Sequence, residues 1–383
     1  MGKKAQLDLW IAIPYVVLSL IGIVMVYSAS VNIGGLNLAT AALHKQVFYV
    51  LLGFGVASGG YAIKLQVLRS WHVLLGFAAV VTGTLILVLL VGGTVNGAKS
   101  WLMIGPINVQ PEEFLKLFII IFFANYLSSH LASNQQHYWH HVKPALILLF
   151  IQGLLVLAQP ETGGFAINMS CILIMVLASG QWRHAPTVII SGLFAMYIVM
   201  IVVLDHVNVH SAFWLHHYQL QRFAAFVDPF GTRRTIGNQL VNSYLAVSNG
   251  GLFGCGLGAG IQKQGYLPEP NTDFILAVIS EELGAVTVLI ILIILGVLVG
   301  HLIRLGNRSS TIFERCFCFG FGTWITVQTL FNAGGVIGAL PITGVTLPFI
   351  SYGGSSTLAL AGGIGIALNI SRHYRLKSGN TKW

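Results

Sequence analysis

Apolar runs long enough to cross a lipid bilayer recur from one end of this chain to the other, and they constrain the fold more than any other feature. A helix rises about 1.5 Å per residue, so a hydrocarbon core of roughly 30 Å needs about 20 apolar residues per crossing. Only 8% of the 383 residues are charged and 55% are hydrophobic, which leaves too little polar surface for a water-soluble globule. We therefore expect an all-α polytopic integral membrane protein, residues 1–383, without a separate soluble domain.

About ten transmembrane helices are predicted. The first follows Lys3 and Lys4 and superficially resembles a signal peptide, but its length and the many later spans favour an uncleaved helix. Ten crossings place both chain ends on one side, although eight crossings would do the same. The predicted spans are residues 9–28, 46–63, 72–93, 111–130, 144–158, 162–180, 186–204, 272–300, 312–335 and 348–370.

The basic residues predict the orientation. They lie in short groups between apolar runs, on the side that receives both termini, and the positive-inside rule makes that side cytoplasmic. Residues 371–383 are then a cytoplasmic tail. Despite a net charge of +9, no basic patch with interleaved aromatics is present, so no nucleic-acid partner is expected.

One connection, residues 204–271 between the seventh and eighth spans, is far longer than a usual helix connection and falls on the extracytoplasmic side. Two shorter outer loops, residues 94–110 and 336–347, open on the same face. Long loops often carry binding or catalytic residues. We therefore expect the chemistry on the extracytoplasmic face.

Asp273 is the strongest candidate for catalysis. Pro268 and Pro270 interrupt regular helix, and Asn271 or Thr272 can cap the helix that follows, so the carboxylate is expected in a first helical turn at the outer interface. It could simply complement the positive end of the helix dipole. It could equally serve as a general base for a hydroxyl nucleophile.

The fourth predicted span begins with a second candidate group. Glu112 and Glu113 precede Lys116 by four and three residues, a spacing that allows intrahelical ion pairs. Alternatively, Lys116 faces a cavity and binds a phosphate while the glutamates set its position. Glu161, at the turn between two spans, is either a solvated acid or a part of the site.

Further along the chain, Glu282 is expected in a structural ion pair or a hydrogen bond between helices. The glycine-rich run 251–260 lacks the strand and the lysine-serine or lysine-threonine ending of a phosphate-binding loop, so we expect a tightly packed loop or re-entrant segment. Lys263 and Arg222 make this outer loop basic, which suits a pyrophosphate-bearing substrate or anionic lipid headgroups. The histidines show no recognised metal-ligand spacing.

Six segments taken together resemble the SEDS family of bacterial membrane proteins, the RodA and FtsW group. They occur in the same order as in the family and cover most of the chain. The segments are NGAKSWLMIGPINVQPEEFLK, AQPETGGF, YQLQRFAAFVDPF, NGGLFGCGLG, KQGYLPEPNTDFILAVISEELG and LPITGVTLPFISYGGSS.

The resemblance implies a peptidoglycan glycosyltransferase that polymerises lipid II, a polyprenyl pyrophosphate-linked disaccharide peptide, beside a class B penicillin-binding protein and other divisome or elongasome proteins. Asp273 matches the family's essential acid, placed to deprotonate the acceptor sugar hydroxyl. The last two segments look more like FtsW than RodA, which favours synthesis at the division septum. The positions expected to bind substrate are Glu113, Lys116, Glu161, Arg222, Lys263, Ser351, Tyr352 and Ser355.

Three positions depart from the family pattern: Ser100 stands where arginine is usual, Glu161 where aspartate is usual, and Asn271 where histidine is common. No cofactor is required by the sequence, although a divalent cation, Mg or Mn, would suit a pyrophosphate leaving group. Two other functions remain open, a transporter that flips lipid II and a scaffold that recruits the penicillin-binding protein.

Overall fold

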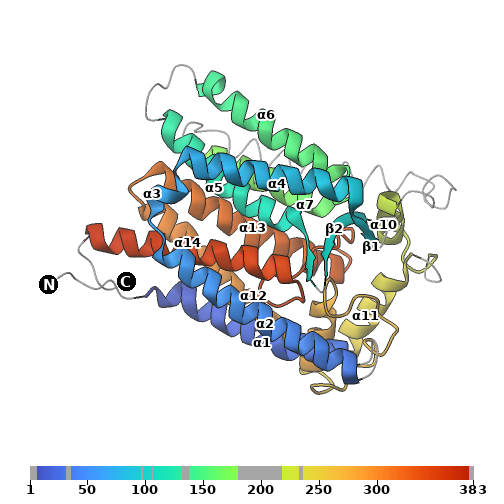
Figure 1. Cartoon of the computed structure of the whole chain (residues 1–383). Coiled ribbons are helices and arrows are strands. Elements are labelled where there is room, and N and C mark those ends of the chain that lie inside the picture. Colours follow the sequence, from blue (N-terminus) through green and yellow to red (C-terminus); the bar gives the residue numbers. More distant parts are fainter. Residues whose placement is uncertain are drawn as a thin grey trace.

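Long helices lying side by side form most of the molecule, and short strands, α10 and α11 lie together at one end of the bundle (Figure 1). The computed structural model describes residues 7–31, 36–95, 98–105, 107–131, 138–179, 218–232 and 236–378. The elements are α1 Leu9–Ser30, α2 Leu36–Ala62, α3 Leu65–Leu68, α4 Trp71–Val91, β1 Gly93–Val95, β2 Ala98–Ile104, β3 Ile107–Val109, α5 Pro111–Leu131, α6 Tyr138–Leu157, α7 Thr162–Ala178, α10 Tyr218–Val227, α11 Asn238–Gly250, α12 Ile275–Arg308, α13 Ile312–Val336 and α14 Gly354–Ser378.

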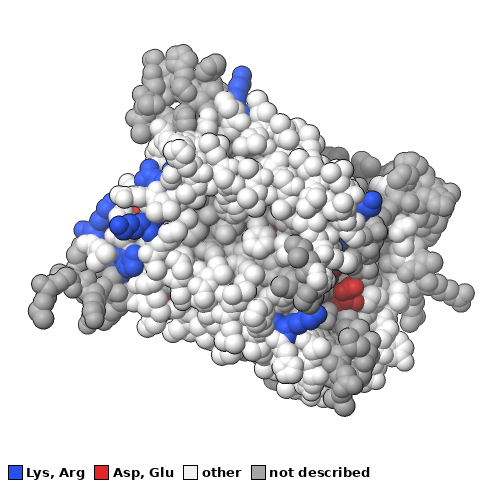
Figure 2. All heavy atoms as spheres, viewed as in Figure 1, with Lys and Arg blue, Asp and Glu red and all other residues white. Residues whose placement is uncertain are grey.

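Every predicted span among the described residues is helical, and the seventh, 186–204, lies outside them. By length and apolarity, five helices of the described chain are long enough to cross a membrane: α1, α2, α4, α12 and α14. Most of the face in Figure 2 carries no charge, and lysines and arginines gather toward the ends of the bundle. The chain is thus a largely helical membrane protein.

Several predicted boundaries are wrong, including the start of α6, which is Tyr138 rather than 144, and the end of α12, which is Arg308 rather than 300. The second helix begins at Leu36 rather than 46, because its first turns contain polar residues that an apolar pattern leaves out. The last helix begins at Gly354 rather than 348, because Phe349 has a left-handed backbone, φ 65°, in the turn that precedes it. This helix continues to Ser378, so most of the predicted tail is helical.

The all-α prediction is also incomplete. The outer loop after α4 forms a small antiparallel sheet in the order β1-β2-β3. Residue Leu102 of β2 pairs with Val109 of β3, and a glycine with φ 60°, Gly105, lies in the turn between them. The sheet carries Ser100 and Trp101 to the site described below.

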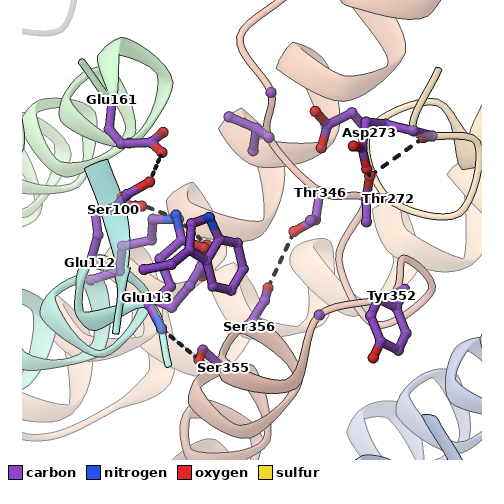
Figure 3. Close-up of a pocket in the computed structure, with 18 of the residues that line it drawn as sticks. Ser100, Glu112, Glu113, Glu161, Thr272, Asp273, Thr346, Tyr352, Ser355 and Ser356 are labelled. Carbon is purple, nitrogen blue, oxygen red and sulfur yellow. Dashed lines mark hydrogen bonds and ion pairs between the residues drawn. The ribbon is translucent and has the colours of Figure 1, made fainter. Parts of the chain in front are cut away.

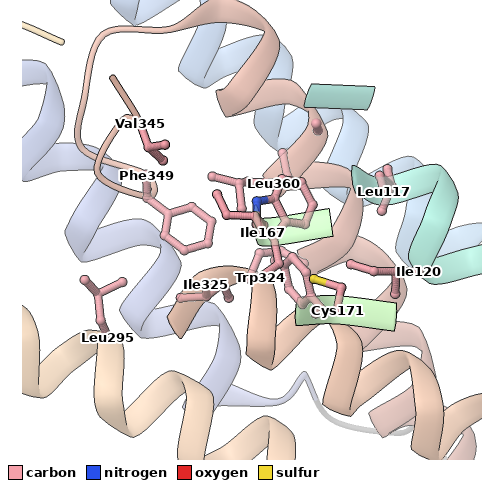
Figure 4. Close-up of a cluster of buried hydrophobic side chains, with 14 of the residues drawn as sticks. Leu117, Ile120, Ile167, Cys171, Leu295, Trp324, Ile325, Val345, Phe349 and Leu360 are labelled. Atoms are coloured by element: carbon pink, nitrogen blue, oxygen red, sulfur yellow. The ribbon is translucent and has the colours of Figure 1, made fainter. Parts of the chain in front are cut away.

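The core lies between α5, α7, α13 and α14, where Trp324, Phe317 and Phe321 are fully buried (Figure 4). Helix α14 is central, because 94% of its most apolar window is buried, against 22% for α12. The outward side chains of α12 therefore lie where lipid would contact the protein. Burial against other helices, rather than greater apolarity, distinguishes the central helix.

Helix α12 is interrupted at Gly284, whose backbone (φ 82°, ψ 168°) is accessible essentially only to glycine. The glycine-rich segment 251–256 supplies the hydrogen bonds that the helix loses there. Cys255 N–H donates to the Glu281 carbonyl at 2.9 Å, and Ala285 N–H donates to the Gly251 carbonyl at 3.0 Å. This is the tight packing predicted for the segment, and it satisfies irregular backbone that lipid could not.

Gly284→Ala should therefore prevent normal folding, because a Cβ there would collide with the Leu252 carbonyl and the Gly254 amide of the loop. We expect a destabilisation of at least about 2 kcal/mol, combining backbone strain with the lost hydrogen bonds. Gly296→Ala is the matched control, since a Cβ at that position of α12 meets no atom within 4 Å. Melting temperature and monodisperse yield in detergent give the readout, and equal values for the two variants would contradict the account.

Candidate functional site

A cavity opens at the end of the bundle that holds the sheet, and side chains far apart in the sequence surround it (Figure 3). Its carboxylates come from several elements, and two cations accompany them. Seven of its ionisable lining residues are Glu112, Glu113, Glu161, Glu269, Asp273, Lys116 and Arg222. In Figure 3, Glu161 and Ser100 lie on one side, Asp273 on the other, and Ser356 from α14 between them.

Asp273 lies in a turn two residues before α12 rather than in a first helical turn. Phe274 N–H donates to the Glu269 carbonyl at 3.3 Å and closes this turn. The Asp273 side chain is half-buried and faces the cavity. Burial raises its pKa to about 7, with Arg222 opposing the shift and Glu269 and Glu161 adding to it. Near neutral pH the carboxyl therefore exists in both protonation states, which suits a general base.

The α5 cluster forms the predicted ion pairs and also lines the cavity. Lys116 Nζ lies 2.8 Å from Glu113 Oε1 and 3.3 Å from Glu112 Oε1, so the intrahelical ion pairs exist. All three side chains are buried and also line the cavity, and Lys116 lies 5.9 Å from the ring centroid of Trp324. The cluster is net negative when ionised, because one lysine neutralises only one of two glutamates. A phosphate group at Lys116 would therefore face a neighbouring carboxylate.

Glu161 lies at the start of α7 inside the cavity, rather than in a solvated turn. Its Oε1 accepts a hydrogen bond from Ser100 Oγ at 2.7 Å. Burial is the main cause that raises the pKa of Glu161, and the Ser100 hydrogen bond and Arg222 oppose it. The two positions that depart from the SEDS pattern on this side of the site, Ser100 and Glu161, are therefore in direct contact.

Three more predicted positions line the cavity. Arg222 projects from α10, and its Nη1 donates to the Ile342 carbonyl at 3.4 Å. Tyr352 and Ser355 lie just before and within the first turn of α14, and Ser355 Oγ accepts from Gln110 N–H at 2.9 Å. Each of these contacts fixes a loop that forms part of the wall.

Two predicted substrate-binding residues are not on the cavity. Ser351 Oγ donates to the Thr272 carbonyl at 2.7 Å and accepts from Leu347 N–H at 2.8 Å, so it supports the wall from behind. Lys263 is fully buried elsewhere, with its Nζ 2.6 Å from Glu282 Oε1 and 3.0 Å from both Ser28 Oγ and the Ser28 carbonyl. The prediction that Lys263 faces substrate is wrong, and the structural ion pair predicted for Glu282 is confirmed.

Several lining residues were not identified from the sequence, among them Glu269, Gln110 and Thr346. Glu269 lies between the two prolines that precede Asp273, and this was the only feature of the sequence that could have indicated that it lines the site. Two further basic residues of this outer loop, Arg233 and Arg234, lie outside the described residues. Within the described ranges, no group of three or more His, Cys, Asp or Glu side chains is arranged to hold a metal ion.

Comparison with known proteins gives one consistent result. A family model described as "Cell cycle protein", for FtsW, RodA and SpoVE, matches residues 9–376. A probable peptidoglycan glycosyltransferase FtsW from Enterococcus hirae is 34% identical over 97% of this chain and 94% of its own length. The stage V sporulation protein E of Bacillus subtilis is 33% identical over 97% of this chain and 99% of its own length.

Solved structures agree with the sequence relatives. A chain from a peptidoglycan synthase complex, solved to explain how polymerisation and crosslinking are coordinated, superposes with a TM-score of 0.73 at 27% identity. The match covers 96% of this chain and 98% of that one. RodA of Thermus thermophilus superposes with a TM-score of 0.66 at 25% identity, covering 96% of this chain and 97% of RodA.

Lys263→Met should destabilise the fold rather than impair substrate binding, because it leaves the Glu282 charge buried without its partner. The expected loss of stability is about 3–5 kcal/mol. Adding Glu282→Gln should recover more than half of the lost melting temperature, since a neutral amide tolerates burial better. Lys143→Met, at an exposed position, is the control. A Lys263→Met protein that melts like the wild type but polymerises poorly would restore Lys263 to the substrate site.

Proposed function

We propose that this chain, which belongs to the FtsW, RodA and SpoVE family of cell cycle proteins, polymerises lipid II into glycan strands at the outer face of the bacterial cytoplasmic membrane. Its activity is that of a peptidoglycan glycosyltransferase, the activity named for relatives that match nearly its whole length. The chain resembles FtsW more than RodA, and we assign it to septal wall synthesis. Ten crossings with both termini in the cytoplasm complete the proposed topology.

The single observation that carries the mechanism is the half-buried carboxyl of Asp273 facing a polar cavity, with a pKa raised by burial to about 7. In the proposed reaction, Asp273 accepts the proton of the acceptor sugar's 4-hydroxyl. The hydroxyl oxygen attacks the anomeric carbon of the donor sugar, and the bond from that carbon to the pyrophosphate oxygen breaks. The polyprenyl pyrophosphate leaves with the bonding electron pair, so atoms and charge balance.

Arg222 is the cation best suited to the departing pyrophosphate. It lines the cavity together with Asp273 and interacts electrostatically with both Asp273 and Glu161. Lys116, by contrast, already has two glutamates as partners. We propose that the α5 cluster binds hydroxyl and amide groups of the substrate, because carboxylate oxygens accept hydrogen bonds from these donors. Tyr352 and Ser355 supply further polar groups to the lining of the cavity.

A class B penicillin-binding protein is the proposed partner. Support comes from the structural match to a chain of a peptidoglycan synthase complex in which polymerisation and crosslinking are coordinated. A divalent cation, if used, would enter with the pyrophosphate of the substrate, and the mechanism above assigns it no step.

Purified protein mixed with labelled lipid II in detergent should form polymer visible on a gel, and Asp273→Asn should reduce the rate by about 10²–10⁴-fold, as loss of a general base does. Asp228→Asn is the control, because asparagine keeps the oxygen that accepts from Gly231 N–H at 2.8 Å. A detergent micelle has no second leaflet to which lipid II could be flipped. Polymer formation by the purified protein would therefore exclude a function that is purely transport or purely scaffolding. An Asp273→Asn protein that polymerises normally, or a wild type that makes no polymer even with its partner, would refute the proposal.

A further inference from the structure

We propose that Asn332 of α13 is a positioning residue for Asp273, holding the catalytic turn and the adjacent segment of the cavity wall at Val345 at a fixed separation. The proposal rests on the function assigned above to Asp273. It concerns a residue that does not line the catalytic cavity itself and is 59 positions away in the chain.

A single carboxamide makes both connections. Asn332 Nδ2 donates one hydrogen to the Asp273 carbonyl at 2.8 Å and the other to the Val345 carbonyl at 2.9 Å. Asp273 and Val345 both line the cavity, and Asn332 is buried behind them. The amide group has two N–H donors, and both are used. The distance between these two parts of the wall is therefore set by one rigid, planar group.

The backbone at Asp273 depends on such external partners. The helical ladder of α12 begins with the Phe274 carbonyl, which accepts from Ala277 N–H at 3.0 Å. The three carbonyls before it point outside the helix, and each accepts a hydrogen bond from the segment 332–352. Tyr352 N–H donates to Asn271 at 2.9 Å, Ser351 Oγ donates to Thr272 at 2.7 Å, and Asn332 donates to Asp273.

Of these three donors, Asn332 acts on the catalytic residue directly. An aspartate side chain is short, so a displacement of its Cα is passed almost fully to the carboxylate. A misplacement of about 1 Å can cost roughly 100-fold in rate. The same support keeps the turn packed against the protein, and burial is the main cause that raises the pKa of the Asp273 carboxyl.

The chain offers a close control in Asn369 of α14. Its Nδ2 also donates to two backbone carbonyls, Gly60 at 3.0 Å and Ile63 at 2.5 Å, and it is buried to a similar degree. Asn369 links α14 to the end of α2, and neither it nor its partners line the cavity. Asn332→Ala and Asn369→Ala therefore each remove two hydrogen bonds to backbone carbonyls, one beside the site and the other remote from it, and Asn369→Ala also removes a 3.5 Å contact with Arg372.

The test compares kcat, KM and the pH profile of polymerisation for the wild type, Asn332→Ala and Asn369→Ala, each normalised to folded, monodisperse protein. The base acts deprotonated, so wild-type kcat should fall as pH decreases through about 7. Asn332→Ala should lower kcat about 100-fold with KM changed less than about threefold. The acidic limb of its kcat–pH profile should move to lower pH, because greater exposure to water lowers the pKa of Asp273. Asn369→Ala should keep the wild-type kcat and limb while melting earlier.

An Asn332→Ala protein with wild-type kcat and an unmoved acid limb would overturn the proposal, as would equal losses in the two variants. If Asn332→Ala yields no folded protein, Ser351→Ala carries the same test, because it deletes one donor to the neighbouring carbonyl with little change in volume. It should shift kcat and the limb in the same direction, and no shift would overturn the proposal. If Asp273→Asn is inactive, these results concern only the positioning; if Asp273→Asn is active, the proposed function itself fails.

Discussion

Every polar group inside a membrane-embedded helical bundle needs a partner from the protein, because no bulk water is available there to replace one. That constraint accounts for the main irregular features of this chain. The break in α12 at Gly284 persists because a glycine-rich loop supplies the missing backbone hydrogen bonds. The same loop brings Lys263 to Glu282, so a buried charge is neutralised beside the break. At Gly284 the irregular backbone therefore lies where another segment pairs with it.

The catalytic turn follows the same rule. Asp273 lies outside α12, and the carbonyls around it are held by Asn332, Ser351 and Tyr352. Asn332 lies in α13, and Ser351 and Tyr352 lie in the connection that leads to α14, at the start of the serine-tyrosine-glycine signature SYGGSS. The signature therefore has two roles in the structure, since Tyr352 and Ser355 line the cavity while Ser351 supports it from behind.

The sequence predicted the features that depend on local pattern. Apolar runs located the long helices among the described residues but not the shorter α3, α10 and α11. Ionisable residues next to apolar runs identified Asp273, Glu113 and Lys116, which line the cavity. Long-range pairing could not be predicted, because the partners are far apart in the chain: Lys263 meets Ser28 across 235 positions. The strands β1 and β3 have only 3 residues each, too few for a recognisable alternation. The contact between Ser100 and Glu161 likewise became visible only in three dimensions.

The central claim is that Asp273 receives a proton from the acceptor sugar. An experimental structure of this chain with lipid II bound in both the donor and the acceptor position tests it most directly. The account predicts the acceptor 4-hydroxyl oxygen within roughly 2.6–3.2 Å of an Asp273 carboxylate oxygen, with the donor pyrophosphate beside Arg222. A structure in which the sugars occupy another groove, with Asp273 enclosed by protein and out of reach of either substrate, would contradict it.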